Sequence, residues 1–194
     1  MRAILPVLSA SLLLTSCAGH EKKILVYASS DIQVDNSQKN IALTEGTTHH
    51  EKELDFTGND PVTLHVQSPA GQYDLVVAGD GLFIANLKND TVVGSYQRVG
   101  VDTGEARISQ EQLTRQIDSL RQLVLGKNLS PSNRNYFIPP GKIARITGAV
   151  NAKVFGPYTR IPGSFDAGSV PEIYKFYTNS EEREIITKLS SMSQ

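Results

Sequence analysis

The fold is decided by residues 62–78, which read Val62-Thr63-Leu64-His65-Val66-Gln67-Ser68-Pro69-Ala70-Gly71-Gln72-Tyr73-Asp74-Leu75-Val76-Val77-Ala78. In the first part, apolar residues at 62, 64 and 66 alternate with polar ones, which is the two-residue period of a half-buried strand. Pro69 and Gly71 supply the turn that follows, because proline and glycine are typical turn residues. Apolar residues at 73, 75 and 77 then share one face of a second strand. The stretch therefore predicts a β-hairpin.

Short strand patterns continue on both sides of this hairpin. Residues 23–29 and 40–44 precede it, and residues 82–87 and 91–93 follow it, with turn residues between them. Short strands at close and regular spacing are typical of an antiparallel sandwich or a small barrel. We therefore predict a β-sandwich-like domain over residues 24–106, which ends in a polar segment with little to bury.

The C-terminal half, residues 107–194, is expected to form a smaller α+β region. A helix is predicted over residues 109–125, where Ser109 and Gln112 fit a capping box. Gly126 then fits the left-handed position that often ends a helix. The apolar stripe of this helix recurs at helical spacing and consists of Leu113, Ile117, Leu120 and Val124.

Shorter elements complete this region. Strands are predicted at residues 142–147 and 153–155, whereas residues 171–177 fit either a strand or a helical turn. A short C-terminal helix is expected to begin at Ser180, or at Thr178 paired with the acidic residue three positions later. The chain as a whole is thus predicted to be α+β and mainly β.

The N-terminal residues have the pattern of an export signal. Arg2 supplies one positive charge, residues 3–14 form a short apolar run, and the stretch Leu14-Thr15-Ser16-Cys17 ends it. A membrane span takes about 20 apolar residues, so this run is too short to be one. Leu14-Thr15-Ser16-Cys17 resembles the lipobox of bacterial lipoproteins, and the alternative is a simple cleaved export signal.

The resemblance implies that residues 1–16 are a signal peptide, cut off before Cys17. The Cys17 thiol would take a diacylglycerol, and the new amino group would be acylated with a fatty acid such as palmitate. Residues 17–23 would then be the lipidated cysteine and a short tether. Ala18, rather than Asp, follows the cysteine, which by resemblance to Gram-negative lipoproteins favours the outer membrane and the periplasm. Cys17 is also the only cysteine, so no internal disulfide is expected.

The charge balance argues against a nucleic-acid partner. The chain has 19 basic and 20 acidic residues, and removal of residues 1–16 takes away only one charged residue, Arg2. Binding to a duplex requires a clustered excess of Lys and Arg. We therefore expect no nucleic acid as a partner, and contact with membrane lipid only through acylated Cys17.

The paired histidines do not form a recognisable zinc motif. A zinc peptidase places a second imidazole four residues after the first, and here Leu54 stands four residues after His50. Phosphate-cradling, dinucleotide-binding and nucleophile-elbow motifs are also absent from the sequence. We therefore predict no metal ion, no cofactor and no catalytic residue.

An acidic row follows the histidines. Glu51, Glu53 and Asp55 would share one face of a strand, where carboxylates could bind calcium or pair a general acid with a base. The favoured interpretation is a solvated strand face, packed against the core through Leu54 and Phe56.

Aromatic residues are concentrated in residues 136–177. Aromatic side chains are favoured anchors of protein interfaces, so this segment is a candidate docking surface for another envelope protein. The alternative is a small core wrapped by loops. The candidate partner-binding residues are Tyr136, Phe137, Tyr158, Phe165, Tyr174 and Tyr177.

These patterns favour a membrane-anchored protein of the bacterial cell envelope with a non-catalytic binding or scaffolding role. The alternative function is an envelope hydrolase whose active site the sequence does not reveal. An enzyme should have a pocket with converging carboxylates, or with His beside Ser, whereas a scaffold should have an apolar surface patch with a polar rim.

Overall fold

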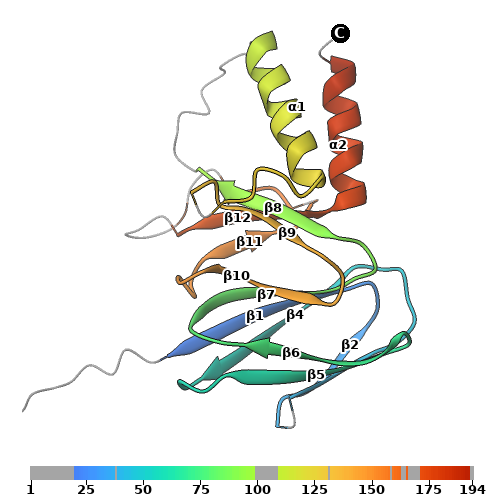
Figure 1. The fold of residues 1–194 in the computed structure, drawn as a ribbon, viewed down its shortest axis with the longest axis vertical. Coiled ribbons are helices and arrows are strands. Elements are labelled where there is room, and N and C mark those ends of the chain that lie inside the picture. The colour runs from blue at the N-terminus through green and yellow to red at the C-terminus, as the bar shows by residue number, and fades with distance from the viewer. Residues whose placement is uncertain are drawn as a thin grey trace, which may run out of the picture.

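A computed structural model describes residues 20–37, 39–98, 109–130, 132–157, 159–162, 165 and 171–192. Within these residues, twelve strands form three four-stranded sheets and two helices form an antiparallel pair (Figure 1). The protein is therefore mainly β within the α+β class, as the sequence predicts. None of the described helices is long and apolar enough to cross a membrane. The signal residues, Cys17, Ala18 and Tyr158 lie outside the described residues.

Sheet A is the central layer. Its strands lie in the order β10-β7-β1-β4, and β1 pairs parallel with β7 and antiparallel with β4. The bounds are β1 Glu21–Ala28, β4 His50–Thr57, β7 Gly81–Leu87 and β10 Lys142–Thr147.

Sheet B lies against one face of sheet A and contains the hairpin that the sequence predicts. Its order is β2-β3-β5-β6, and Leu64 of β5 pairs with Leu75 of β6 in the antiparallel register of that hairpin. The bounds are β2 Ile32–Asp35, β3 Asn40–Leu43, β5 Val62–Ser68 and β6 Gly71–Val77.

Sheet C lies against the other face of sheet A. Its order is β11-β12-β8-β9, so β8 pairs with strands that come much later in the chain. Residues 171–177, which fit either a strand or a helical turn, lie mostly in strand β12. The bounds are β8 Val92–Gln97, β9 Asn135–Ile138, β11 Lys153–Phe155 and β12 Ile173–Thr178.

Two apolar clusters fill the space between the three sheets. Alternate residues of β1 belong to different clusters, because successive side chains of a strand point to opposite faces. Ile24 and Val26 contact sheet B in the first cluster, whereas Tyr27 belongs to the second cluster, which faces sheet C. All seven residues of β7 are buried, as expected for a strand covered on both faces.

Helix α1, Gln110–Val124, begins at the expected capping box. The Ser109 hydroxyl accepts a hydrogen bond from the Gln112 amide at 3.2 Å, and the Gln112 side chain accepts one from the Ser109 amide at 2.9 Å. Gly126, at the other end, has a φ of 67°, which glycine adopts without steric cost. The helix predicted over residues 109–125 is therefore confirmed to within one residue.

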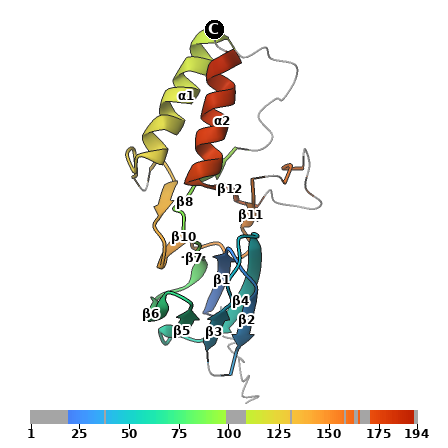
Figure 2. The same cartoon turned by 90° about the vertical axis from the view of Figure 1, so that its right-hand side faces the viewer.

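Helix α2, Asn179–Met192, packs against α1 although four strands separate the two helices in the chain. Thr178 caps it, because its hydroxyl accepts from the Glu181 amide at 3.2 Å while the Glu181 carboxylate accepts from the Thr178 amide at 2.7 Å. The two helices stand on sheet C and point away from sheets A and B (Figures 1 and 2). Their shared cluster contains Leu113, Ile117, Leu120, Val124, Ile186 and Leu189.

The strand pairing differs from a purely antiparallel arrangement. Each sheet contains one parallel pair: β1 with β7, β3 with β5, and β11 with β12. The sheets also take strands from both sides of residue 106, since β10 completes sheet A and β8 lies in sheet C. Periodicity within one segment does not reveal such pairings, because they depend on contacts between segments far apart in the chain.

Candidate functional site

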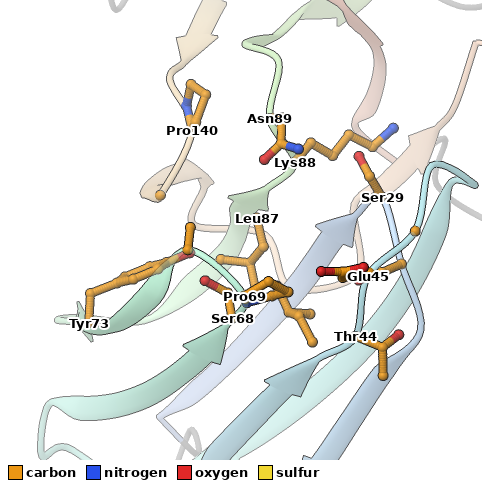
Figure 3. Close-up of a pocket in the computed structure, with 15 residues that line it drawn as sticks. Ser29, Thr44, Glu45, Ser68, Pro69, Tyr73, Leu87, Lys88, Asn89 and Pro140 are labelled. Atoms are coloured by element: carbon orange, nitrogen blue, oxygen red, sulfur yellow. The ribbon is translucent and has the colours of Figure 1, made fainter.

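A cavity of about 450 Å³ opens at one end of sheets A and B (Figure 3). Parallel pairing accounts for its position. β1 and β7 run in the same direction, as do β3 and β5, so the residues that follow each pair meet at the same edge. The lining residues are Ser29, Ser30, Leu43, Thr44, Glu45, Gly46, Ser68, Pro69, Ala70, Tyr73, Leu87, Lys88, Asn89, Pro140 and Gly141.

The lining combines apolar walls with groups that can hydrogen-bond. The Tyr73 ring stands on one side and Glu45 and Ser29 on the other, with Leu87 between them (Figure 3). Burial raises the pKa of the Tyr73 hydroxyl, so this group stays protonated at neutral pH. A mixed lining of this kind can hold a small polar molecule by a few directed hydrogen bonds.

A fully buried asparagine shapes the turn that carries Lys88 into the cavity wall. The side-chain amide of Asn86 donates to the carbonyls of Asp90 at 2.9 Å and Ile138 at 2.8 Å. Its side-chain oxygen accepts from the Lys88 amide at 3.0 Å. Asn86 was not among the candidate residues, although an asparagine inside an otherwise apolar run is a signal that could have found it.

Lys88 is unusual among the residues that line this cavity, because it is a lysine that is only 8% exposed. Burial lowers the pKa of the Lys88 ammonium, and the nearby carboxylates of Glu181, Glu51 and Asp90 only partly offset that effect. Figure 3 shows Lys88 on the same side of the cavity as Ser29.

The paired histidines lie apart from this cavity and bind neighbouring carboxylates. Nε2 of His49 is 2.8 Å from Oε1 of Glu51, and Nδ1 of His50 is 3.2 Å from Oδ1 of Asp31. Among the described residues, no group of three or more His, Cys, Asp or Glu side chains is placed to hold a metal ion.

The acidic row lies on the exposed face of β4. Nζ of Lys23, on the neighbouring strand β1, is 2.7 Å from Oε1 of Glu53 and 4.0 Å from Oδ1 of Asp55. Leu54 is buried and Phe56 packs against the first core cluster. The interpretation as a solvated strand face is therefore confirmed.

The candidate docking aromatics divide between core and surface. Tyr174 is fully buried in the cluster between sheets A and C, so its side chain offers no surface to a partner, and its candidacy is corrected. Tyr136 packs at the edge of that same cluster. Phe137, Phe165 and Tyr177 are half-buried. Of these aromatic residues, Tyr174 therefore contributes to the core, whereas Phe137, Phe165 and Tyr177 remain partly accessible.

A polar network that the sequence does not predict lies beside the buried Tyr174 ring. Oε2 of Glu172 accepts hydrogen bonds from Oγ1 of Thr147 at 2.5 Å, from the Tyr174 hydroxyl at 2.9 Å and from Nη2 of Arg134 at 2.7 Å. Burial raises the pKa of the Glu172 carboxyl, but these three donors outweigh it and leave the pKa below its ordinary value.

The same contacts also shift the pKa values of the two titratable partners of Glu172, Arg134 and Tyr174. Burial lowers the pKa of the Arg134 guanidinium, but the hydrogen bonds with Tyr174 and Glu172 more than compensate. Burial, together with the hydrogen bond to Glu172, raises the pKa of the Tyr174 hydroxyl to about 12. The network is therefore an ionised Arg-Glu pair beside a neutral tyrosine at neutral pH.

Comparisons of the chain with models of protein families, with curated proteins and with solved structures find no match.

Proposed function

We propose that this chain is an exported lipoprotein of the bacterial cell envelope, held by acylated Cys17, and that it binds a small polar molecule in the cavity of Figure 3. The sequence Leu14-Thr15-Ser16-Cys17 supports the anchor. In a Gram-negative cell the anchor would lie in the outer membrane. The binding role is non-catalytic.

The observation that carries the proposal is that the cavity lies at the C-terminal end of β1, whereas Cys17 precedes the N-terminal end of this strand in the sequence. Cys17 lies four residues before Glu21, where β1 begins, whereas Ser29 and Ser30 follow its end and line the cavity. A strand rises about 3.3 Å per residue, so the cavity lies about 25 Å from the N-terminal end of β1, to which an acylated Cys17 would be joined. The cavity mouth would therefore lie in the aqueous compartment and away from the lipid surface.

A nuclear magnetic resonance titration tests the binding role. The full chain, labelled with ¹⁵N and solubilised in detergent, is titrated with mono- and disaccharides and with short peptides. We expect amide shifts confined to the non-proline residues of the lining, which are residues 29–30, 43–46, 68, 70, 73, 87–89 and 141. Ala70→Trp should abolish them by filling the cavity mouth, whereas Val76→Trp, on an exposed side chain outside the lining, should not. Equal behaviour of the two variants, or shifts spread over the surface, would contradict the proposal.

One observation favours the hydrolase alternative. Ser29, Ser30 and Lys88 line the same cavity, and a lysine whose pKa is lowered by burial can act as a base toward a serine hydroxyl. A fluorophosphonate probe distinguishes the two functions. A hydrolase would be labelled on one serine, and its Ser→Ala variant would not be. The binding role predicts no labelling.

A further inference from the structure

A second cavity, of about 500 Å³, opens beside β9 and β10. Its charged side chains are two arginines, Arg134 from the segment before β9 and Arg145 from β10, and no carboxylate lines it. The cavity of Figure 3, in contrast, has both Glu45 and Lys88 in its lining. The remaining lining residues are Leu129, Ser130, Asn135, Tyr136, Ile146 and Thr147.

Arg134 is held in place before any ligand arrives. Its Cζ lies 4.0 Å from the centre of the Tyr96 ring, while Nη2 is 2.7 Å from Oε2 of Glu172. Stacking on one side and an ion pair on the other restrict the rotation of the side chain, so binding costs little further conformational entropy. Glu172 lies outside the lining, so it orients Arg134 without occupying the cavity.

Arg145 brings a charge that lacks a direct partner of opposite sign. Its Nε donates to the Asp80 backbone carbonyl at 2.7 Å, which is a neutral acceptor. The Asp80 carboxylate is 2.5 Å from Nδ1 of His20 and 3.7 Å from Nζ of Lys22, and it attracts Arg145 only over a longer distance. Within the described part of the chain, Arg145 forms no ion pair with a carboxylate. Its other N–H groups are therefore available to an anion.

The two strands that carry this cavity are tied to each other. The Tyr136 hydroxyl on β9 donates to the Ile146 carbonyl on β10 at 2.5 Å, and Thr147 is bonded to Glu172. These hydrogen bonds join the two backbone segments that carry the arginines. Leu129 and the half-buried Tyr136 ring supply the apolar surface next to them, whereas the Ile146 side chain is buried in the cluster between sheets A and C.

We propose that this cavity is a binding site for a small molecule that bears an oxyanion, a carboxylate or a phosphate ester, on an apolar body. The guanidinium fork matches the oxygens of both groups and forms two parallel hydrogen bonds with either. The apolar surface of Leu129 and Tyr136 accommodates the body of the molecule. The site is separate from the cavity of Figure 3, and each can be tested without the other.

Calorimetric titration of the full chain in detergent tests the site with three probes. Benzoate carries a carboxylate, phenyl phosphate carries a phosphate ester, and benzamide is the neutral counterpart of benzoate. We expect at least one anion to bind and benzamide not to bind, with the tighter anion identifying the oxyanion that the site takes. Failure of both anions to bind below about 10 mM, or equal binding of benzamide, would overturn the proposal.

Matched variants distinguish binding at this cavity from non-specific attraction of an anion to the positive charges of the protein. Arg145→Gln should weaken anion binding by about tenfold or more, and Arg145→Lys should weaken it less, because the charge stays while the fork is lost. Lys142→Gln removes one positive charge from the same strand outside the lining and should leave the affinity unchanged. Equal losses in Arg145→Gln and Lys142→Gln would also overturn the proposal. Since the Arg145 side chain is exposed, Arg145→Gln and Arg145→Lys should both keep the thermal midpoint of the parent.

Discussion

Nη2 of Arg134 lies 2.7 Å from Oε2 of Glu172, at the point where sheet C meets the edge of sheet A. The same oxygen of Glu172 accepts from Thr147 at the end of β10, so one carboxylate joins the two sheets. The pair also covers the buried ring of Tyr174. Glu172 is therefore expected to stabilise the contact between the two sheets, although its side chain is partly exposed.

Glu172→Gln should therefore destabilise the protein by about 1.5 to 3 kcal/mol, since hydrogen bonds to a charged group are lost. The pKa of Glu172 is lowered by folding, so its contribution is present above the unfolded pKa and disappears as the pH falls through the folded value. Urea unfolding at neutral and at acid pH measures both effects. Glu53→Gln, which removes an exposed ion pair with Lys23, should cost less than about 1 kcal/mol. Equal losses in the two variants would refute this role.

Ile117 is the central apolar residue between the two helices, with an exposed fraction of 3%. Ile117→Ala should lower the free energy of unfolding by about 2 to 4 kcal/mol, through lost burial and the cavity that remains. Arg115→Ala, on the exposed side of the same helix, should change it by less than about 0.5 kcal/mol. Chemical unfolding of the two variants checks this, and similar shifts would contradict the packing of α1 against α2.

Glu182 is a buried acid in the first turn of α2, only 2% exposed, and its Oε2 has no hydrogen-bond partner among the described residues. Burial raises its pKa to about 7; Lys175 opposes this increase and Glu181 adds to it. Between the ordinary value near 4.5 and about 7, the folded protein holds a proton that the unfolded chain has lost. Stability should therefore fall as the pH rises through this range, and change no further above it.

Glu182→Gln removes this titration and should be more stable than the parent at pH 8 by roughly 1 to 3 kcal/mol. At pH 4 the two proteins should differ much less. Glu184→Gln, an exposed neighbour on the same helix, serves as the control and should follow the parent at both pH values. Thermal midpoints across the pH range measure this, and a parent whose stability does not fall between pH 5 and 7 would contradict it.

The two neighbouring aromatics Phe176 and Tyr177 face opposite sides of β12. Phe176 is 1% exposed and belongs to the cluster between sheets A and C, whereas Tyr177 is half-buried beside Lys175. Phe176→Ala should cost about 3 to 5 kcal/mol, and Tyr177→Ala should cost clearly less. Guanidinium unfolding decides this, and a larger loss in Tyr177→Ala would show that the other face of β12 carries the core.

Local signals predicted the elements that depend on local chemistry. Ser109 and Gln112 marked the start of α1 because a capping box uses residues three positions apart. The alternation of residues 62–77 likewise predicted β5 and β6, since both strands and their turn are contiguous. The acidic row was also interpreted correctly, because Leu54 and Phe56 between the carboxylates indicated which face is buried.

The features that the sequence did not predict depend on distant segments. The parallel pairing of β1 with β7 brings together residues almost 60 positions apart, as with Lys22 and Gly81. Arg134 and Glu172 meet because β8 lies between β9 and β12, the two strands that these residues precede. Both cavities are likewise lined by separate loops and strand ends. Composition and periodicity carry no information about contacts between segments that lie far apart in the sequence.

The proposed function depends on the lipid anchor. Mass spectrometry of the native N-terminal peptide, isolated from membranes, tests this anchor most directly. The account predicts a mature chain that begins at Cys17, with the added mass of a thioether-linked diacylglycerol and an amide-linked fatty acid. Cys17→Ala should release the protein to the soluble fraction, whereas Ser11→Ala, within the apolar run, should leave it membrane-bound. An unmodified Cys17, or cleavage at another bond, would contradict the account.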